Sequence, residues 1–499
     1  MLNVPTHALP QTPGRGRVSL LAIAGAVLLT GCSTLAPDYT RTALPLADDW
    51  RAELAAQNAT PASVQSSSQS SQGLSSELAT QLPWQNFIKD PRLAELIELA
   101  LSNNRSLQQT LADVEAARAT YRIQRADLFP NLDVGLNGNR SRLASGVKET
   151  NYQAELGLSG YEIDLFGKNR SLSAAQMEAY LATAATAKAA HIALISEVAN
   201  AWLTLAADNS ALTLAQETMA NAEKTLAITR KRLELGVDSQ VDVASAETVY
   251  HRARADIALY TSQVAQDTNA LRLLVGEQLN ERLLATALPS SATLVSDVPA
   301  GLSSEVLLQR PDVLAVEHSL KSAHANIGVA RAAYLPSLSL TANGGVASSV
   351  LADIFSGGAS TIWAISPSIT LPIFDGGANS ANLAYSKAQQ RKALAAYEYA
   401  IQSAFAEVAD ALARRATIQE QLDAEQALVA AASRSYSLSL ARYQNGVDSF
   451  QTALEAQRTM YSAQQSLILT RQADLDNRIT LYRVLGGGLA AHNSEQGEG

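Results

Sequence analysis

One stretch of sequence decides the fold: residues 169–235 read NRSLSAAQMEAYLATAATAKAAHIALISEVANAWLTLAADNSALTLAQETMANAEKTLAITRKRLEL. This stretch contains neither glycine nor proline, the two residues that cost most inside a helix. At 1.5 Å per residue, a continuous helix of this length would span roughly 100 Å. Because no single globular core is that wide, such a helix must bury its apolar side against other helices along its axis.

An apolar seam of period 3.5 runs along this stretch, as is typical of helices that pack like a coiled coil. Its members, with the complementary positions last, are Val198, Leu205, Leu212, Met219, Leu226, Leu233, Leu194, Ala201, Ala215 and Ala222. Asp208 and Thr229 interrupt the seam. The run breaks at residues 235–239, LGVDS, and resumes from about Asp242. The sequence therefore predicts a long helical hairpin over residues 169–275.

The same pattern occurs a second time. A run free of glycine and proline covers residues 378–445 and ends in NGVDS at 445–449. At a constant offset of 210 positions, the residues that repeat between the two runs include Arg232 and Arg442, Gly236 and Gly446, Val237 and Val447, Asp238 and Asp448, and Ser239 and Ser449. We interpret this ungapped match as an internal duplication. It predicts two tandem structural repeats, with a second long hairpin over residues 378–485.

The N-terminus has the pattern of an export signal. Arg15 and Arg17 precede an apolar run at residues 18–29 that is too short to span a membrane. The run leads into LTGC at 29–32, which resembles the bacterial lipobox, so we expect residues 1–31 to be removed and Cys32 to be acylated, for example with palmitate. The alternative is an incidental cysteine after an ordinary signal peptide. Ser33, rather than Asp, after the cysteine favours sorting to the outer membrane.

Composition excludes several classes of function. The chain carries 38 basic and 47 acidic residues, a net charge of −9 that becomes −11 without residues 1–31, so nucleic acid is not expected as a partner. Cys32 is the only cysteine, so stability must come from packing and oligomerisation instead of disulfides. The six histidines show no ligand spacing, and no phosphate loop or nucleophile motif is present. We therefore expect no catalytic residue, metal site or cofactor, and we expect His318 and His324 to lie on the surface of a helix.

Two segments, at about 131–163 and 337–373, alternate apolar and polar residues with a period of two. Each predicts a pair of strands of about ten residues, the length of a tilted strand that crosses a bilayer. In the first pair the strands flank a polar loop at residues 140–149. Pro367 lies inside the last strand, where it predicts a bulge or a late strand start, because proline is confined to edges, bulges and strand starts.

The predicted organisation follows from these boundaries. It comprises a signal peptide (1–31), a lipid-anchored tether (32–83), a first repeat (84–277), a linker (278–303), a second repeat (304–488) and a disordered tail (489–499). The fold class is mainly α with a transmembrane β part. Four strands cannot close a membrane barrel, and an open sheet edge in lipid leaves backbone groups unsatisfied at a cost of several kcal/mol each. The smallest assembly that closes such a barrel around a wide lumen is a trimer, with a 12-stranded β-barrel continued by an α-helical barrel.

The order of motifs resembles the TolC-type outer-membrane efflux channels, in particular their OprM-like lipoprotein branch. The motifs are the lipobox, the doubled strand-pair and hairpin, LFP at 128–130, LPSL at 335–338, RPDV at 310–313 and RYQNGV at 442–447. This resemblance implies a homotrimer in the outer membrane that extends into the periplasm and serves as the passive exit duct of a tripartite efflux pump. The implied partners are a periplasmic adaptor and an inner-membrane transporter of the proton-driven resistance-nodulation-division type, with multidrug resistance as the associated phenotype.

The resemblance also assigns roles to residues. It places the adaptor-docking tips at Arg232, Gly236, Val237, Asp238, Ser239, Arg442, Gly446, Val447, Asp448 and Ser449. The alternative for the glycines and aspartates is that they are present because a tight turn requires these residue types, and not because an adaptor binds them. The periplasmic gate would fall at Gln451 and Glu455, and three Glu455 carboxylates around a threefold axis would repel one another. The alternative for Glu455 is a solvated helix face. For the whole chain, the alternative function is a non-pore, coiled-coil lipoprotein of the cell envelope, which has no need of the strand pairs.

Overall fold

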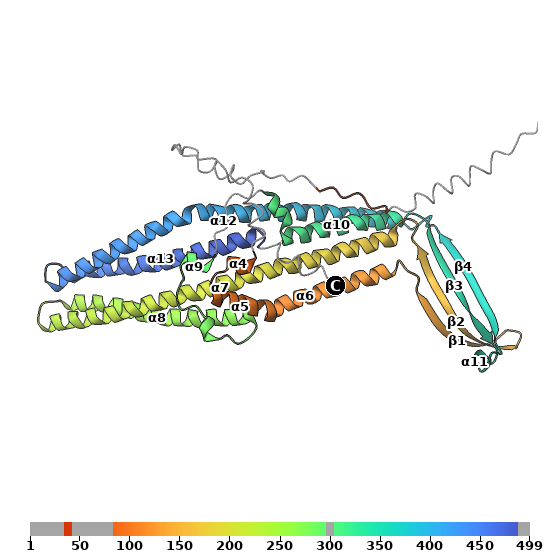
Figure 1. The fold of residues 1–499 in the computed structure, drawn as a ribbon, viewed down its shortest axis with the longest axis horizontal. Coiled ribbons are helices and arrows are strands. Elements are labelled where there is room, and N and C mark those ends of the chain that lie inside the picture. The colour runs from red at the N-terminus through yellow and green to blue at the C-terminus, as the bar shows by residue number, and fades with distance from the viewer. Residues whose placement is uncertain (1–33, 42–82, 296–303, 488–499) are drawn as a thin grey trace, which may run out of the picture. The chain divides into compact units, whose positions relative to one another are not determined.

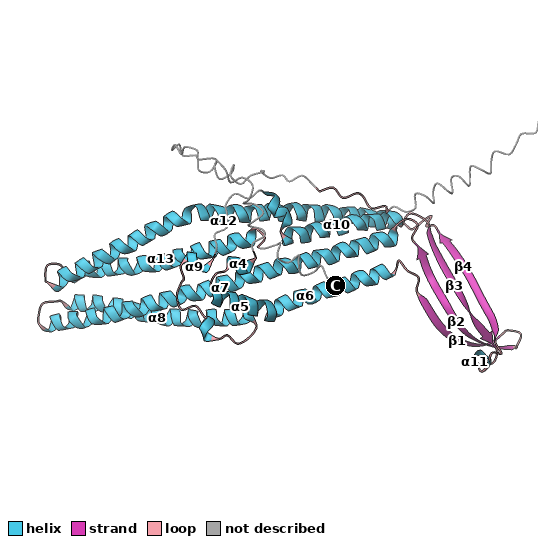
Figure 2. Cartoon of the chain, viewed as in Figure 1, coloured by secondary structure: helices cyan, strands magenta, loops and turns pink. Residues whose placement is uncertain are grey.

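The computed structural model describes residues 34–41, 83–295 and 304–487. These residues fall into two compact units, each of which is described by itself. The sheet unit contains the described residues among 34–41, 116–181 and 318–395. The hairpin unit contains those among 83–115, 182–295, 304–317 and 396–487. Figures 1 and 2 show that the described chain is mostly helical, with a single small sheet.

The elements follow one another along the chain in an order that places strands between long helices. They are α4 (Trp84–Phe87), α5 (Pro91–Asn103), α6 (Arg105–Ala126), β1 (Leu132–Arg142), β2 (Lys148–Ile163), α7 (Lys168–Glu234), α8 (Gln240–Val275), η1 (Glu281–Leu283), α9 (Ser291–Leu294), η2 (Ser304–Gln309), α10 (Pro311–Ala332), β3 (Ser337–Ser348), α11 (Asp353–Ser356), β4 (Ser360–Thr370), α12 (Ala378–Gln444) and α13 (Phe450–Val484).

The two longest helices are α7 and α12, each with 67 residues. Both begin after a strand pair and end at the glycine-containing turns that the sequence singles out. In α7 the seam residues Val198, Leu205 and Leu226 are buried, as their heptad spacing predicts. Among the described helices, only α7 contains a window apolar and long enough to cross a membrane, and 56% of that window is buried inside the protein. Its apolar residues therefore serve helix packing.

Aromatic and aliphatic side chains form the main core of the hairpin unit. Trp202 of α7 is fully buried, and its indole Nε1 donates to the carbonyl oxygen of Leu283 at 2.9 Å. The ring of Phe87 stacks on that of Tyr482, with centroids 4.2 Å apart. Residues that lie far apart in the sequence, from Trp84 to Tyr482, pack together in this cluster. The helices that contribute to it include α4, α5, α7, α8 and α13.

The RPDV motif at residues 310–313 has a structural role at the start of α10. The Arg310 side chain is 5% exposed and forms ion pairs with Asp312 and Glu407. Its Nη1 also donates to the carbonyl oxygen of Val484 at 2.9 Å, near the end of α13. A buried guanidinium needs such partners, because an unpaired buried charge is costly. Arg310 therefore joins the start of α10 to α12 and α13.

The four strands form one antiparallel sheet in the order β1-β2-β3-β4. The β1–β2 register pairs Leu132 with Leu158 at one end and Arg142 with Lys148 at the other. The strands extend into both ends of the polar segment predicted as a loop at 140–149, and only residues 143–147 connect β1 to β2. Between Leu158 and Tyr161 the register of β2 against β3 shifts, and Gly160 there has φ of +62°. Glycine meets no steric penalty in that conformation.

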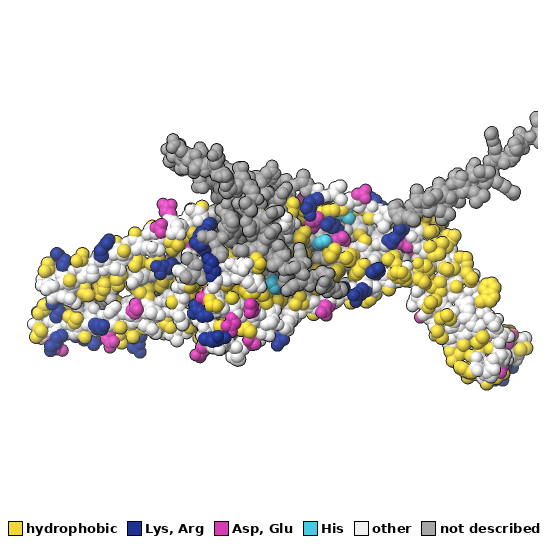
Figure 3. All heavy atoms as spheres, in the orientation of Figure 1, with side chains coloured by type: hydrophobic (Ala, Val, Ile, Leu, Met, Phe, Trp, Pro, Cys, Tyr) yellow, Lys and Arg dark blue, Asp and Glu magenta, His cyan; other side chains and the backbone are white. Residues whose placement is uncertain are grey.

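The register gives the sheet one apolar and one polar face, because directly paired residues of antiparallel strands point to the same side. The apolar face carries Leu132, Val134, Leu136, Tyr152, Ala154, Leu156, Leu158, Tyr161, Ile163, Leu338, Leu340, Ala342, Val346, Trp363, Ile365, Pro367 and Ile369. Many of these side chains are exposed, among them Val134 at 83% and Trp363 at 75%. Figure 3 shows hydrophobic side chains gathered on the visible side of the strands.

The opposite face is mostly polar, and its apolar members are Ala347, Ile362 and Ala364. It carries Asp133, Asn137, Asn139, Ser141, Glu149, Asn151, Gln153, Glu155, Glu162, Ser337, Ser339, Thr341, Asn343, Ser360, Ser366, Ser368 and Thr370. The Glu155 carboxylate accepts hydrogen bonds from Asn137 of β1 and Asn343 of β3, which links three strands. This ladder of polar contacts is suited to water on that side of the sheet.

The expectation of a bulge or late strand start at Pro367 is wrong. β4 runs through Pro367 without interruption, and Pro367 pairs with Leu340 in a continuous register. The physical reason is its position on an edge strand within one copy. There β4 bonds to β3 on one side only, so alternate residues need no N–H for this ladder.

The expectation that His318 and His324 lie on the surface is also wrong. The Nδ1 atom of His318 lies 2.6 Å from Glu178 Oε2, and both side chains are half-buried. His324 contacts Gln390, and its ring meets the edge of Tyr39 with centroids 5.6 Å apart. Tyr39 belongs to the segment 34–41, which packs on α10. The spacing of residues along a helix cannot show that another segment covers one of its side chains.

Candidate functional site at the helical turns

The first turn, between α7 and α8, is closed by its own backbone. Gly236 has φ of +73°, which suits glycine, and its N–H donates to the carbonyl oxygen of Leu233 at 2.9 Å. The N–H of Val237 donates to the carbonyl oxygen of Arg232, also at 2.9 Å. These two bonds form the Schellman motif that ends many helices. The glycine is therefore required by the turn itself.

Ser239 then starts α8 with a capping box. The hydroxyl of Ser239 accepts a hydrogen bond from the N–H of Asp242, and the Asp242 carboxylate accepts one from the N–H of Ser239 at 2.9 Å. This reciprocal arrangement satisfies two backbone donors at the helix start. Hydrogen bonds therefore close the first turn on both sides.

The second turn, between α12 and α13, repeats the first with one difference. Gly446 has φ of +71°, and the N–H groups of Gly446 and Val447 donate to the carbonyl oxygens of Tyr443 and Arg442 at 2.9 Å each. Ser449 starts α13 without a side-chain cap. Thr452 stands where the first turn has Asp242, so no carboxylate is present there to complete a capping box. Val237 and Val447 are each 61% exposed, so an apolar side chain protrudes from both turns.

An arginine and an aspartate pair across each turn. Arg232 and Asp238 lie 3.0 Å apart, with side chains 21% and 6% exposed. Arg442 and Asp448 form the equivalent pair, but their side chains are 57% and 28% exposed. The hydrogen bond from the Arg442 guanidinium lowers the pKa of Asp448, and the same bond raises the pKa of Arg442. The first pair is thus buried by neighbours that the second lacks.

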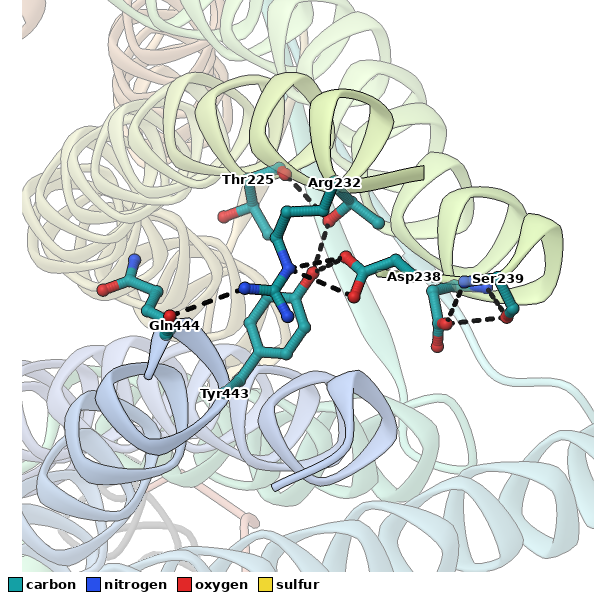
Figure 4. Close-up of polar contacts among 8 residues, drawn as sticks. Thr225, Arg232, Asp238, Ser239, Tyr443 and Gln444 are labelled. Carbon is teal, nitrogen blue, oxygen red and sulfur yellow. Dashed lines mark hydrogen bonds and ion pairs between the residues drawn. The ribbon is translucent and has the colours of Figure 1, made fainter. Parts of the chain in front are cut away.

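Those neighbours come from the second hairpin, as Figure 4 shows. The Tyr443 hydroxyl donates to Asp238 Oδ2, and it also lies 3.2 Å from the hydroxyl of Thr229, which is fully buried. The Arg232 guanidinium covers the Tyr443 ring at 4.7 Å from its centroid, a cation–π contact. Burial and the Asp238 carboxylate raise the pKa of Tyr443, so the phenol stays protonated and donates. Together these contacts join the two hairpins at their turns.

Gln451 and Glu455 lie one helical turn apart at the start of α13 and are both exposed. Gln451 Nε2 donates to Glu455 Oε1 at 2.9 Å. Their neighbours Ala453 and Leu454 are buried in the cluster that includes Tyr443 and Phe450. The apolar side of α13 therefore packs inward and leaves the Gln451–Glu455 side free for other contacts.

The structure brings the predicted turn residues together and adds two that sequence reasoning missed. In the sequence, Tyr443 stands out only as part of the RYQNGV motif, and Thr229 only as an interruption of the seam. A polar residue in an apolar seam is a signal for a buried hydrogen bond, and Thr229 fits it. The predicted lipidation site Cys32, the signal peptide and the tail lie outside the described residues. Among those described, no group of three or more His, Cys, Asp or Glu side chains is placed to hold a metal ion.

Comparison with known proteins settles the family. The model of the protein family described as "Outer membrane efflux protein" matches residues 96–277 and 302–487, which is most of the chain. The chain belongs to the outer membrane efflux protein family. The match covers both long hairpins and all four strands.

Relatives of this efflux protein agree in length as well as in sequence. The probable efflux pump outer membrane protein TtgC of Pseudomonas putida is 42% identical over 477 residues, which is 94% of this chain and 96% of the relative. The outer membrane protein OprJ of Pseudomonas aeruginosa is 39% identical over 481 residues, with 94% and 95% covered.

Solved structures of membrane proteins share the fold. A membrane protein from Pseudomonas aeruginosa matches with a TM-score of 0.82 at 37% identity, over 91% of this chain and 98% of that one. The open state of the Neisseria gonorrhoeae MtrE outer membrane channel matches with a TM-score of 0.80 at 36% identity, over 92% and 99% of the two chains. The chain is therefore an outer-membrane efflux channel protein, a member of a family of transport proteins.

Proposed function

We propose that three copies of this efflux protein close a 12-stranded β-barrel that continues into an α-helical barrel, forming the passive exit duct of a tripartite pump. The observation that carries the proposal is the division of the sheet into an apolar and a polar face. A barrel in a membrane needs an apolar exterior, and a wide channel needs a polar lumen. A spacer without a pore needs neither.

The open edges of the sheet support the trimer. Within one copy, β1 and β4 are each paired on one side only, so their outer backbone groups lack partners in the sheet. In lipid, such groups must be satisfied by other strands, because water is absent. Pairing β4 of one copy with β1 of the next satisfies them and closes the ring. The equal lengths of α7 and α12 fit the inferred duplication, which would place matching helices around the helical barrel.

We further propose that acylated Cys32 anchors each copy in the outer membrane and that the two turns form the periplasmic end. The exposed Val237 and Val447 support these turns as adaptor-docking sites, since protruding apolar side chains mark interaction surfaces. The partners would be a periplasmic adaptor and an inner-membrane transporter of the resistance-nodulation-division type. At the same end, Gln451 and Glu455 would line the constriction, and the contact between Tyr443 and Asp238 would hold it narrow.

The experiment that tests the duct uses full-length protein purified from outer membranes. A heat-modifiable trimer on gels, together with ion conductance in planar bilayers, is the expected result. A monomer without conductance would contradict the duct and favour the envelope spacer. For the docking sites, Val237→Asp with Val447→Asp should abolish co-purification of an adaptor, while leaving conductance in place. Adaptor retention by that double variant would exclude the turns as docking sites.

A further inference from the structure

The apolar face of the sheet ends in positive charge. On β1, Leu132, Val134 and Leu136 share this face, and the next residues on the same side after Gly138 are Arg140 and Arg142. Both arginines are exposed. Across β2, the Tyr152 ring lies so close to Gly138 that a Cβ on that glycine would be 3.1 Å from it. Along this face, apolar side chains therefore come first, the Tyr152 ring follows, and the cations lie at the end near the turn 143–147.

A third cation lies directly opposite. Lys148 pairs with Arg142 in the β1–β2 register, so both side chains point to the same face, and Thr150 pairs with Arg140. Like charges placed opposite each other on neighbouring strands destabilise the pair. An anion between or beside the cations relieves this repulsion and gains charge-assisted hydrogen bonds. We call Arg140, Arg142 and Lys148 the cation cluster.

The protein supplies no such anion in the part of the chain that the structure describes. Glu149 pairs with Ser141, which places it on the polar face. The Asp353 carboxylate of α11 accepts a hydrogen bond from Ser348 at 2.8 Å. No ion pair joins any residue of the cation cluster to a carboxylate within residues 34–41, 83–295 and 304–487. Within these residues no carboxylate offsets the repulsion among the three cations, and an added anion would relieve it.

We propose that the cation cluster binds the phosphate groups of the phosphorylated glycolipid in the outer leaflet of the outer membrane. This inference rests on the proposed function, in which the strand ends at the helices face the periplasm and the turn 143–147 faces outward. The acyl chains of such a lipid would lie along Leu132, Val134 and Leu136, and its headgroup phosphates would reach the cations just beyond Tyr152. Continuity between the apolar stripe and the cluster favours a lipid over a soluble anion, which would gain nothing from the stripe.

The first test uses the unaltered trimer. Full-length protein is incubated in detergent with lipid A that carries both phosphates or with dephosphorylated lipid A, and bound lipid is counted by native mass spectrometry. The phosphorylated form should be retained, and retention should fall as sodium chloride is raised, because the contacts are exposed. Equal retention of the two forms would overturn the proposal. Conductance of the same preparation in phosphatidylcholine bilayers is recorded in parallel, so failure of the duct is seen separately from failure of lipid binding.

The second test uses variants of the cluster. Neutralising a surface cation at a membrane interface weakens binding about fivefold, so Arg140→Gln with Arg142→Gln and Lys148→Gln should weaken retention of phosphorylated lipid A about 100-fold. Arg140→Lys with Arg142→Lys and Lys148→Arg should retain the lipid. The control variant loses three positive charges at exposed helix positions, through Lys224→Gln, Arg254→Gln and Arg391→Gln. Its retention of phosphorylated lipid A should not change. Undiminished retention by the neutral cluster variant, or an equal loss in all three proteins, would overturn the proposal.

Discussion

The Tyr443 hydroxyl donates a hydrogen bond to the Asp238 carboxylate, which joins two turns whose bonded residues lie 205 positions apart in the sequence. Tyr443 has no equivalent in the first hairpin, where Leu233 stands at the matching position. The two turns of one chain are therefore alike in backbone and unlike in side-chain contacts. Because the first turn holds the buried ion pair and the second the exposed one, the two should respond differently to substitution.

Tyr443→Phe removes the hydrogen bond to Asp238 and the contact with Thr229 but keeps the ring beneath Arg232. We expect the free energy of local opening at the first turn to fall by about 1.5–3 kcal/mol, the range for a hydrogen bond to a charged group. Hydrogen exchange at residues 229–240 measures it, with the exposed Tyr399→Phe as the control. Unchanged exchange at these residues would mean that the hydrogen bond does not hold the turn.

Asp238→Asn and Asp448→Asn form a matched pair, since both aspartates pair with an arginine six positions earlier. Asp238 also accepts from Tyr443 and is only 6% exposed on its side chain. We expect Asp238→Asn to lower local stability by about 1–3 kcal/mol, because Arg232 would lose its partner. Asp448→Asn, at an exposed pair, should have a smaller effect. Hydrogen exchange at both turns measures the difference, and equal effects would contradict the asymmetry between the pairs.

Asp208 of α7 should make stability depend on pH. Burial in the hairpin, followed by the adjacent Asp267 carboxylate, raises the pKa of Asp208 to about 6. The folded state therefore binds a proton more tightly than the unfolded chain, so this contribution to stability is present below the unfolded pKa near 4 and is lost as pH rises through about 6.

Asp208→Asn should therefore raise stability at pH 8 by on the order of 1–2 kcal/mol and leave it nearly unchanged at pH 4. Thermal unfolding in detergent at the two pH values, followed by circular dichroism, measures this. Glu217→Gln replaces an exposed carboxyl on the same helix and should not reproduce the effect. A gain at pH 4 as large as at pH 8 would rule out Asp208 as the origin.

Two adjacent glycines of β3 provide a test of the sheet. A Cβ at Gly345 would collide with the carbonyl oxygen of Ala154, whereas a Cβ at Gly344 would meet nothing within 4 Å. We expect Gly345→Ala to disrupt pairing of β2 with β3 and to reduce the yield of heat-modifiable trimer severalfold. Gly344→Ala should assemble normally. Normal assembly of both variants would show that β2 and β3 do not approach each other so closely.

Glu455→Ala should raise single-channel conductance in planar bilayers, because it removes both a side chain and a charge from the proposed constriction. Glu420→Ala, an exposed position on α12, is the control. If conductance and ion selectivity stay the same in the Glu455 variant, Glu455 does not belong to the constriction.

The elements were predictable from sequence where the determinants are local. The absence of glycine and proline over residues 169–235 predicts the extent of α7, and the break at residues 235–239 predicts its separation from α8. Contacts between distant segments were not predictable in this way. The bond between Tyr443 and Asp238 depends on how two hairpins pack, and His324 is covered by a segment almost 300 positions away. The course of β4 through Pro367 depends on its place at the sheet edge, which no local pattern encodes.

The unpaired edges of β1 and β4 also have a genetic consequence. In the proposed trimer no copy can complete its own wall, so every copy contributes to a product it shares with two others. A variant that assembles normally but is blocked at its turns would enter mixed trimers and disable intact copies. Such an allele should be dominant over the normal gene when both are expressed, whereas a variant unable to join strands should be recessive.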